Sequence, residues 1–143
     1  MSFQRFGLVL LLAFTLMPSL TFASSANYNY ISAAELESRL TSSSPINIVD
    51  IQVEAEFSQH HIKGATPTYA YPVKSDADRA KLDGAITQLN ANSDPIVIVC
   101  PRGGGGAKRT YDYLLGQGVP VKRLLILEKG QSGWSSAALM VGE

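Results

Sequence analysis

Cys100 is the only cysteine among the 143 residues of the sequence, and it stands between an apolar run and four consecutive glycines. The stretch IVIVCPRGGGGAKRTYDYLL predicts a buried strand at residues 96–100, then a glycine-rich loop and a helix. Successive glycines allow peptide N–H groups to converge on one point and bind an anion. The N-terminus of the following helix adds positive potential, and both effects favour a thiolate. Cys100 is therefore the predicted catalytic nucleophile.

The residues after the cysteine are expected to bind an anionic substrate. Lys108 and Arg109, at the start of the helix, add positive charge that would attract such a substrate. Several loop glycines are expected to adopt positive φ, so that their N–H groups face the sulfur. The predicted substrate-binding residues are Arg102, Gly103, Gly104, Gly105 and Gly106.

Other glycine-rich structures fit this stretch less well. A flexible linker rarely joins a buried strand directly to a helix. A nucleotide-binding P-loop ends in Gly-Lys-Ser/Thr, whereas Gly106 is followed here by Ala107 and Lys108. The dinucleotide pattern G-x-G-x-x-G would need an acidic strand end about 20 residues further on, and the sequence offers none.

The strands and helices that must position Cys100 alternate along the chain. β-branched runs predict strands at residues 46–51, 96–100 and 121–128. Ser32, with Glu35 three residues later, is expected to cap the first helix. Such alternation is typical of a parallel sheet with helices on both faces, which binds ligands at the carboxyl ends of its strands. The sequence predicts one α/β domain, with helices at residues 32–40, 54–62, 76–90, 107–115 and 131–140.

Three segments resemble the signatures of the rhodanese family, the sulfurtransferase fold. IVIVC with its loop is similar to the family's persulfide loop, and LLILEKGQSGW to the closing signature, with Gly130 and Trp134 at the matching positions. IVDIQVEAEFSQHHIKGA is similar to the first signature, and the matching residues are Asp50, Glu56, Phe57, His61, Ile62, Gly64 and Ala65.

The resemblance covers residues 30–134 and implies both a fold and a reaction. The implied fold is rhodanese-like α/β, with a central parallel sheet and helices on both faces. The implied activity is transfer of sulfane sulfur from thiosulfate or polysulfide to a thiophilic acceptor through a Cys100 persulfide. This covalent intermediate would make a separate cofactor unnecessary.

The sequence departs from the family pattern at the site itself. Gln52 stands where the family usually has arginine, and His60 where it usually has glycine. The loop after Cys100 is one residue longer than the common sulfurtransferase loop, as in the phosphatase and arsenate-reductase relatives of the fold. Those relatives carry Cys-x5-Arg, whose arginine clamps an oxyanion, but the matching position here is Gly106. Arg102 or Arg109 could replace the clamp only if the loop folds back on itself.

Asp50, His61 and Trp134 are supporting candidates. Asp50, at a strand end, is expected to fix a loop by hydrogen bonding, with acid–base catalysis as the alternative. The resemblance implies a structural place for His61 near the sheet rather than base catalysis. Trp134 is expected to pack a helix onto the sheet, with a place at the pocket mouth as the alternative. Adjacent His60 and His61 would point about 100° apart on a helix, so no metal site is predicted.

Residues 1–23 are predicted to form a signal peptide. Arg5 precedes a short apolar stretch, and small residues surround the expected cleavage site after Ala23, with Ala26 as the alternative. The apolar run is shorter than the roughly 20 residues that a spanning helix needs. We therefore expect an exported, periplasmic protein whose rhodanese-like domain is residues 24–143. An unpaired cysteine in an oxidising compartment is a liability unless its chemistry is used.

The charge balance limits the partners of the protein. Lys and Arg total 12 and Asp and Glu total 12, so the basic stripe of a nucleic-acid-binding protein is not expected. The expected partners are a small anionic sulfur donor, a thiol or cyanide acceptor and a redox or sulfur-relay protein; a membrane is not expected after signal cleavage. Two alternatives to the enzyme remain. One is a carrier module that holds sulfur without turnover, and the other is a phosphatase or arsenate reductase of the same fold, against which Gly106 argues.

Overall fold

Residues 27–142 are described by a computed structural model, and the predicted signal peptide lies outside them. Within these residues, no helix is long and apolar enough to cross a bilayer. In chain order the elements are β1 (Tyr30–Ile31), α1 (Ala33–Thr41), β2 (Asn47–Asp50), α2 (Glu54–Gln59), β3 (His61–Ile62), β4 (Thr66–Pro67), α3 (Asp76–Ala80), α4 (Asp83–Leu89), β5 (Ile96–Val99), α5 (Gly105–Gly116), β6 (Leu124–Leu127) and β7 (Met140–Val141), with 3₁₀ turns η1 (Val121–Arg123), η2 (Gln131–Gly133) and η3 (Ala137–Leu139).

Five parallel strands form the central sheet, in the order β1-β6-β5-β2-β4. The three strands predicted from the sequence share this sheet, with β5 between β2 and β6. Asp50 pairs with Val99 in the β2–β5 register. The end of β2 therefore lies beside the residue that precedes Cys100, at the carboxyl edge of the sheet.

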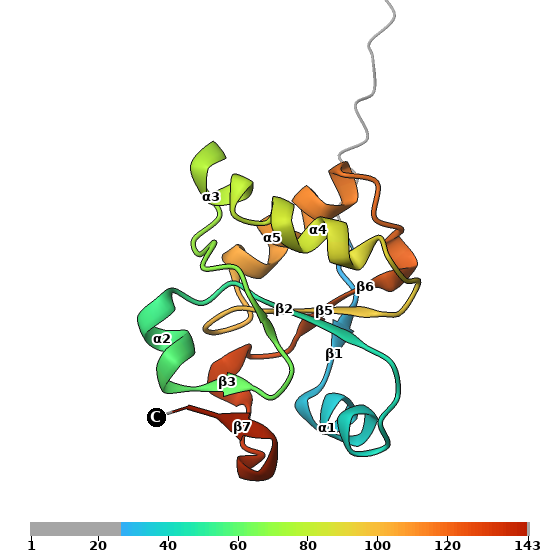
Figure 1. Cartoon of the computed structure of the whole chain (residues 1–143), viewed down its shortest axis with the longest axis vertical. Coiled ribbons are helices and arrows are strands. Elements are labelled where there is room, and N and C mark those ends of the chain that lie inside the picture. Colours follow the sequence, from blue (N-terminus) through green and yellow to red (C-terminus); the bar gives the residue numbers. More distant parts are fainter. Residues whose placement is uncertain (1–26, 143) are drawn as a thin grey trace, which may run out of the picture.

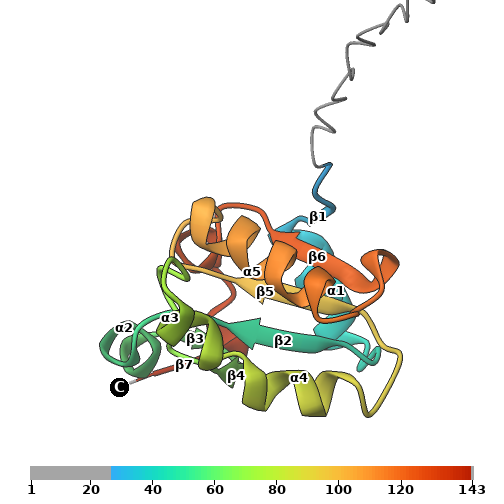
Figure 2. The ribbon, with the colours of Figure 1, turned by 90° about the horizontal axis from the view of Figure 1, so that it is seen from above.

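Alternation along the strands builds one core on each face of the sheet. Ile96 and Ile98 belong to the core beneath α4 and α5, whereas Val97 and Val99 belong to the core shared with α1. Figure 1 shows α3, α4 and α5 above the sheet and α1 below it, and Figure 2 shows the same layers from above. Because both faces are covered, β5 can be apolar at every position. The predicted α/β fold is confirmed.

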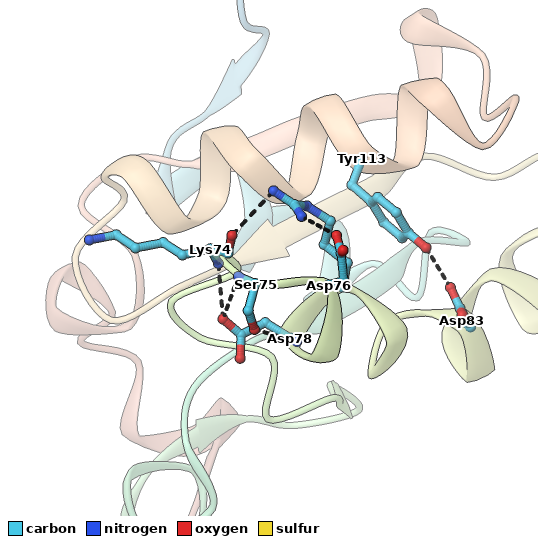
Figure 3. Close-up of polar contacts among 7 residues, drawn as sticks. Lys74, Ser75, Asp76, Asp78, Asp83 and Tyr113 are labelled. Carbon is cyan, nitrogen blue, oxygen red and sulfur yellow. Dashed lines mark hydrogen bonds and ion pairs between the residues drawn. The ribbon is translucent and has the colours of Figure 1, made fainter.

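The predicted helix at residues 76–90 is two helices. Ser75 caps α3 with a reciprocal capping box, in which its side chain accepts from Asp78 N–H and the Asp78 carboxylate accepts from Ser75 N–H (Figure 3). The helix is interrupted at Lys81 and Leu82, and the Leu82 side chain is fully buried. The break starts α4 at Asp83, whose carboxylate accepts a hydrogen bond of 2.7 Å from the Tyr113 hydroxyl of α5. The prediction of a single helix was wrong, because α3 ends in tighter 3₁₀-type hydrogen bonds, from Lys81 N–H to the Asp78 carbonyl and from Leu82 N–H to the Arg79 carbonyl.

Two other predicted helices differ from the structure. Residues 54–62 form only α2, because His61 and Ile62 are extended and pair antiparallel with β7. Residues 131–140 form two 3₁₀ turns and part of β7 instead of a helix. Residues 121–123 are likewise a 3₁₀ turn, so β6 begins later than predicted. Ser32 caps α1 as predicted, accepting a hydrogen bond of 3.1 Å from Glu35 N–H.

Candidate active site

Cys100 directly follows β5 and is almost completely buried, with 2% of its surface exposed. Its Sγ accepts a hydrogen bond of 2.9 Å from the backbone N–H of Gly103. Gly103 has φ +73°, a conformation in which glycine is favoured over other residues. Within the loop, positive φ is confined to Gly103 rather than spread over several glycines as expected.

The first half of the loop is fixed by the turn at Gly130. Gln131 N–H donates to the Cys100 carbonyl at 2.8 Å, and Ser132 N–H donates to the Pro101 carbonyl at 3.0 Å. A Cβ on Gly130 would overlap the Cys100 carbonyl oxygen and lie 2.6 Å from Gly103 N. Gly130 also has φ +56°. The closing signature therefore has a physical basis, because the backbone of the cysteine loop passes too close to this turn for any side chain.

The second half of the loop is less constrained. A Cβ on Gly104 would meet no atom within 4 Å, and one on Gly105 would lie 2.8 Å from Nη1 of the Arg109 side chain. Gly106 is buried, and a Cβ there would lie 3.0 Å from the Tyr71 ring. Helix α5 begins at Gly105, so only a short part of the glycine run remains loop.

The cations predicted to serve the loop take different places. Arg102 is exposed and lines the pocket beside the loop. Arg109 donates two hydrogen bonds, of 3.0 and 2.8 Å, to the Pro72 carbonyl. The Lys108 ammonium lies 5.5 Å from the centre of the Tyr28 ring. Arg109 and Lys108 therefore tie α5 to other segments, and Arg102 alone of the three borders the pocket.

Asp50 and Gln52 form a buried hydrogen-bonded pair at the end of β2. The Asp50 carboxylate accepts from Gln52 N–H at 2.8 Å and from Gln52 Nε2 at 3.0 Å, and Nε2 also donates to the His60 carbonyl. Burial raises the pKa of Asp50 from 3.8 to about 6, although the Gln52 hydrogen bonds and the nearby His61 oppose that rise. Within the described residues, the side chain hydrogen-bonded to this carboxylate is therefore a neutral amide rather than a cation.

His61 is engaged by α2. Its Nδ1 is 2.8 Å from the Phe57 carbonyl oxygen, and its ring stacks on the Phe57 ring with centroids 3.8 Å apart. Trp134 is buried in the core shared with α1 and also lines the pocket. It therefore combines the predicted packing position with the alternative position at the pocket. Among the described residues, no group of three or more His, Cys, Asp or Glu side chains could hold a metal ion.

A pocket of about 380 Å³ lies beside the cysteine loop. Two loop residues, Pro101 and Arg102, form part of its wall. The sequence analysis did not single out Gln59, Gln131, Ser132 or Met140 of this pocket; for Gln131, the position directly after Gly130 in the closing signature was the available signal. The complete lining is Gln52, Glu56, Gln59, His60, Pro101, Arg102, Gln131, Ser132, Trp134 and Met140.

Sequence comparison identifies the domain to which this site belongs. The family model of the rhodanese-like domain matches residues 32–137. The chain belongs to the rhodanese family. No curated protein sequence matches it.

Solved structures with the rhodanese fold share the fold of the chain but little of its sequence. A rhodanese-like domain from Anabaena superposes with a TM-score of 0.62 at 20% identity, covering 82% of this chain and 81% of that one. A yeast protein tyrosine phosphatase of the rhodanese family gives 0.66 at 18%, covering 83% and 95%. Thiosulfate sulfurtransferase from Pseudomonas aeruginosa gives 0.61 at 21%, covering 81% of this chain but 20% of that one. At such identities the likeness concerns the rhodanese fold, and the reaction must be argued from the site.

Proposed function

We propose that this rhodanese domain is a sulfurtransferase that carries sulfane sulfur as a persulfide on Cys100. The observation that carries the proposal is the position of Sγ at the end of β5, where Gly103 N–H donates to it at 2.9 Å. A donor aimed at sulfur stabilises an anionic thiolate and, after loading, an anionic persulfide. The proposed substrate-binding groups are the loop backbone from Arg102 to Gly106 and the Arg102 side chain.

The proposed reaction has two displacement steps. In the first, the Cys100 thiolate attacks the outer sulfur of thiosulfate, the sulfur–sulfur bond of thiosulfate breaks, and sulfite leaves with that electron pair. A polysulfide would react in the same way and leave as a shortened chain. In the second, a thiolate or cyanide attacks the outer sulfur of the persulfide, and Cys100 leaves as thiolate. No electron acceptor or cofactor is consumed.

The loop argues against the phosphatase or arsenate-reductase alternative. The sixth residue after Cys100 is Gly106, buried beneath Tyr71, so no arginine side chain is available at that position. Arg109 is held by the Pro72 carbonyl. Oxyanion chemistry of that kind depends on a cation clamped over the transferred group. The carrier alternative differs from the enzyme only in turnover, so it is separated by kinetics.

The proposed setting is the periplasm, after removal of the signal peptide. The proposed partners are a small anionic sulfur donor, a thiol or cyanide acceptor and a redox or sulfur-relay protein.

Mass spectrometry and kinetics with Cys100→Ser test the proposal. Incubation with thiosulfate is expected to add the mass of one sulfur atom to the wild-type protein and none to Cys100→Ser. Thiocyanate formation from thiosulfate and cyanide should be lost in the variant, while its circular dichroism and melting temperature match the wild type. Loading without turnover would establish the carrier, and hydrolysis of an aryl phosphate without loading would establish the phosphatase.

A further inference from the structure

The end of β2 is joined to the pocket wall by a chain of hydrogen bonds. Asp50 is fully buried, and its carboxylate accepts from both the backbone N–H and the side-chain Nε2 of Gln52. The same Nε2 donates to the His60 carbonyl at 3.1 Å. Gln52 and His60 both line the pocket beside the cysteine loop. One amide thus connects a buried carboxyl, which does not line the pocket, to a residue that does.

This chain of hydrogen bonds lies beside the proposed nucleophile. Asp50 pairs with Val99, the residue before Cys100, in the register of β2 and β5. His60 is the C-terminal cap of α2 and leads directly into β3. The bond from Gln52 to the His60 carbonyl therefore fixes the corner between α2 and β3 against the strand that adjoins Cys100.

The hydrogen bonds of the chain suit only the ionised form of the carboxyl. A carboxylate accepts at both oxygens, and here both oxygens accept from Gln52. Protonation turns one oxygen into a donor, which needs an acceptor that the backbone N–H cannot offer. The side-chain amide of Gln52 can meet this need by turning its oxygen toward Asp50, and Nε2 then leaves the His60 carbonyl. The two protonation states therefore favour different orientations of one pocket residue.

The groups around Asp50 place this change in an accessible range of pH. Burial raises the pKa of Asp50 to about 6, against the opposing effects of its accepted hydrogen bonds and of His61 in β3, with a smaller upward contribution from Glu56 of α2. Cys100 is the titratable group that follows β5. Thr68, after β4, is neutral, and its N–H and hydroxyl both bind the Asp50 carbonyl. Asp50 is therefore mostly ionised at neutral pH and mostly protonated at about pH 5.

We propose that Asp50 is a positioning residue for sulfur transfer, which holds the pocket wall through Gln52 when it is ionised and releases the wall when it is protonated. The role in transfer rests on the proposed function. Ionised Asp50 keeps the Gln52 amide bonded to the His60 carbonyl, so the wall beside the sulfur donor is fixed. Protonation frees this wall, and loading of Cys100 slows because attack requires close alignment of the reacting atoms.

NMR tests the chain of hydrogen bonds without any sulfur chemistry. In Cys100→Ser, both side-chain amide protons of Gln52 are expected to shift with a midpoint near pH 6, because a turn of the amide breaks its bonds to Asp50 and to His60 together. Asp50→Asn in the same background should abolish both transitions, although the histidines still titrate. Titration of neither proton, or only of the one bonded to Asp50, would overturn the proposal.

Kinetics test the effect on transfer. We compare the rate constant for loading Cys100 from thiosulfate in wild type and in a variant, because their ratio cancels the ionisations that both proteins share. For Asp50→Asn and Gln52→Met, the ratio of wild type to variant should be roughly threefold to tenfold at about pH 8 and should fall toward one at about pH 5. Thr68→Val, which removes a hydroxyl bound to the Asp50 carbonyl, is the matched control and should give one ratio at both pH values. Ratios independent of pH in the first two variants would overturn the proposal.

The two proposals can fail separately. Titration of both Gln52 protons without any sulfur loading of Cys100 would support the two orientations of Gln52 and reject the sulfurtransferase. Sulfur loading and turnover, with the same pH dependence in wild type and Asp50→Asn, would support the sulfurtransferase and reject the positioning role of Asp50.

Discussion

The two halves of the glycine-rich loop differ in what holds them. From Cys100 to Gly103, backbone packs against backbone, with Gly130 and its neighbours so close that neither Gly103 nor Gly130 could carry a side chain. From Gly104 to Gly106, open space or side chains surround the chain. The first half also supplies the N–H that contacts Sγ. The four consecutive glycines, residues 103–106, are therefore constrained unequally. The difference arises because the turn at Gly130 packs against Gly103 and not against the three that follow.

The largest effect is expected from Gly130→Ala. The added Cβ would overlap the Cys100 carbonyl at a residue with positive φ, so the turn and the loop must separate. Strain at positive φ costs about 1–2 kcal/mol and overpacking about 1–3 kcal/mol, so we expect a loss of about 2–5 kcal/mol in the free energy of unfolding. Urea denaturation measures it, and Gly116→Ala, where a Cβ would meet no atom within 4 Å, is the control.

Gly103→Ala is expected to come next, with a loss of about 2–4 kcal/mol. Its Cβ would lie 2.7 Å from Lys129 N, and φ is +73°. Because Gly103 N–H contacts Sγ, sulfur loading of Cys100 should slow even at temperatures where the variant stays folded. Loading at the wild-type rate by a folded Gly103→Ala would show that this N–H is not needed for transfer.

The end of β2, beside the cysteine loop, is held by the buried Asp50 carboxyl instead of a glycine turn. Because burial raises the pKa of Asp50 to about 6, the folded state binds a proton that the unfolded state releases near pH 4. This contribution is present in full below pH 4 and is lost as pH rises through 6, by about 3 kcal/mol at most. Asp50→Asn should flatten the corresponding slope of stability against pH. If the free energy of unfolding depended on pH in the same way in wild type and Asp50→Asn, the raised pKa of Asp50 would be contradicted.

Arg109→Met, in the helix that follows Gly104–Gly106, should lower the free energy of unfolding moderately. It removes two hydrogen bonds to the Pro72 carbonyl and keeps most of the aliphatic stem, so we expect a loss of about 1–2 kcal/mol. Sulfur loading should change less than in Gly103→Ala, because Arg109 does not contact Cys100 or line the pocket. A larger loss of loading than of stability would mean that Arg109 acts on substrate after all.

The smallest effect is expected from Gly104→Ala. Its φ is −97°, and a Cβ would meet no atom within 4 Å, so the free energy of unfolding should change by less than about 1 kcal/mol. Thermal melts and loading rates measured beside Gly103→Ala provide the comparison. Equal damage from both substitutions would remove the distinction between the two halves.

The sheet could be predicted from sequence because its signal is local. Apolar β-branched runs such as residues 96–99 specify a strand buried on both faces, and the strand end then locates Cys100. The closing signature pointed to Gly130 only through family resemblance. Its physical reason, the approach of the Cys100 carbonyl, is a contact between distant parts of the chain that no local pattern encodes.

The errors in the sequence analysis have the same origin. Strand β3 depends on a partner near the C-terminus, β7, which no local pattern indicates. That Arg109 attracts an anion stays a prediction, but its hydrogen bonds to the Pro72 carbonyl join segments far apart in the sequence and could not be predicted from local pattern. The pocket likewise joins residues 52–60 to residues 131–140, which lie far apart in the sequence.

The antiparallel pair of β3 and β7 has a consequence for the order of folding. It joins His61 to Val141, and Gly142 packs so closely on the Gln59 carbonyl that a Cβ there would overlap it. Contacts between residues so far apart carry a larger loop-closure cost than the β2–β5 and β5–β6 pairs on either side of the cysteine strand, so we expect them to form later than those two pairs. The pocket walls at residues 59–60 and 140 meet at this pair. A chain emerging from the ribosome would thus have its cysteine strand in place before the pocket beside it has both walls, and the last residues to dock would close that pocket.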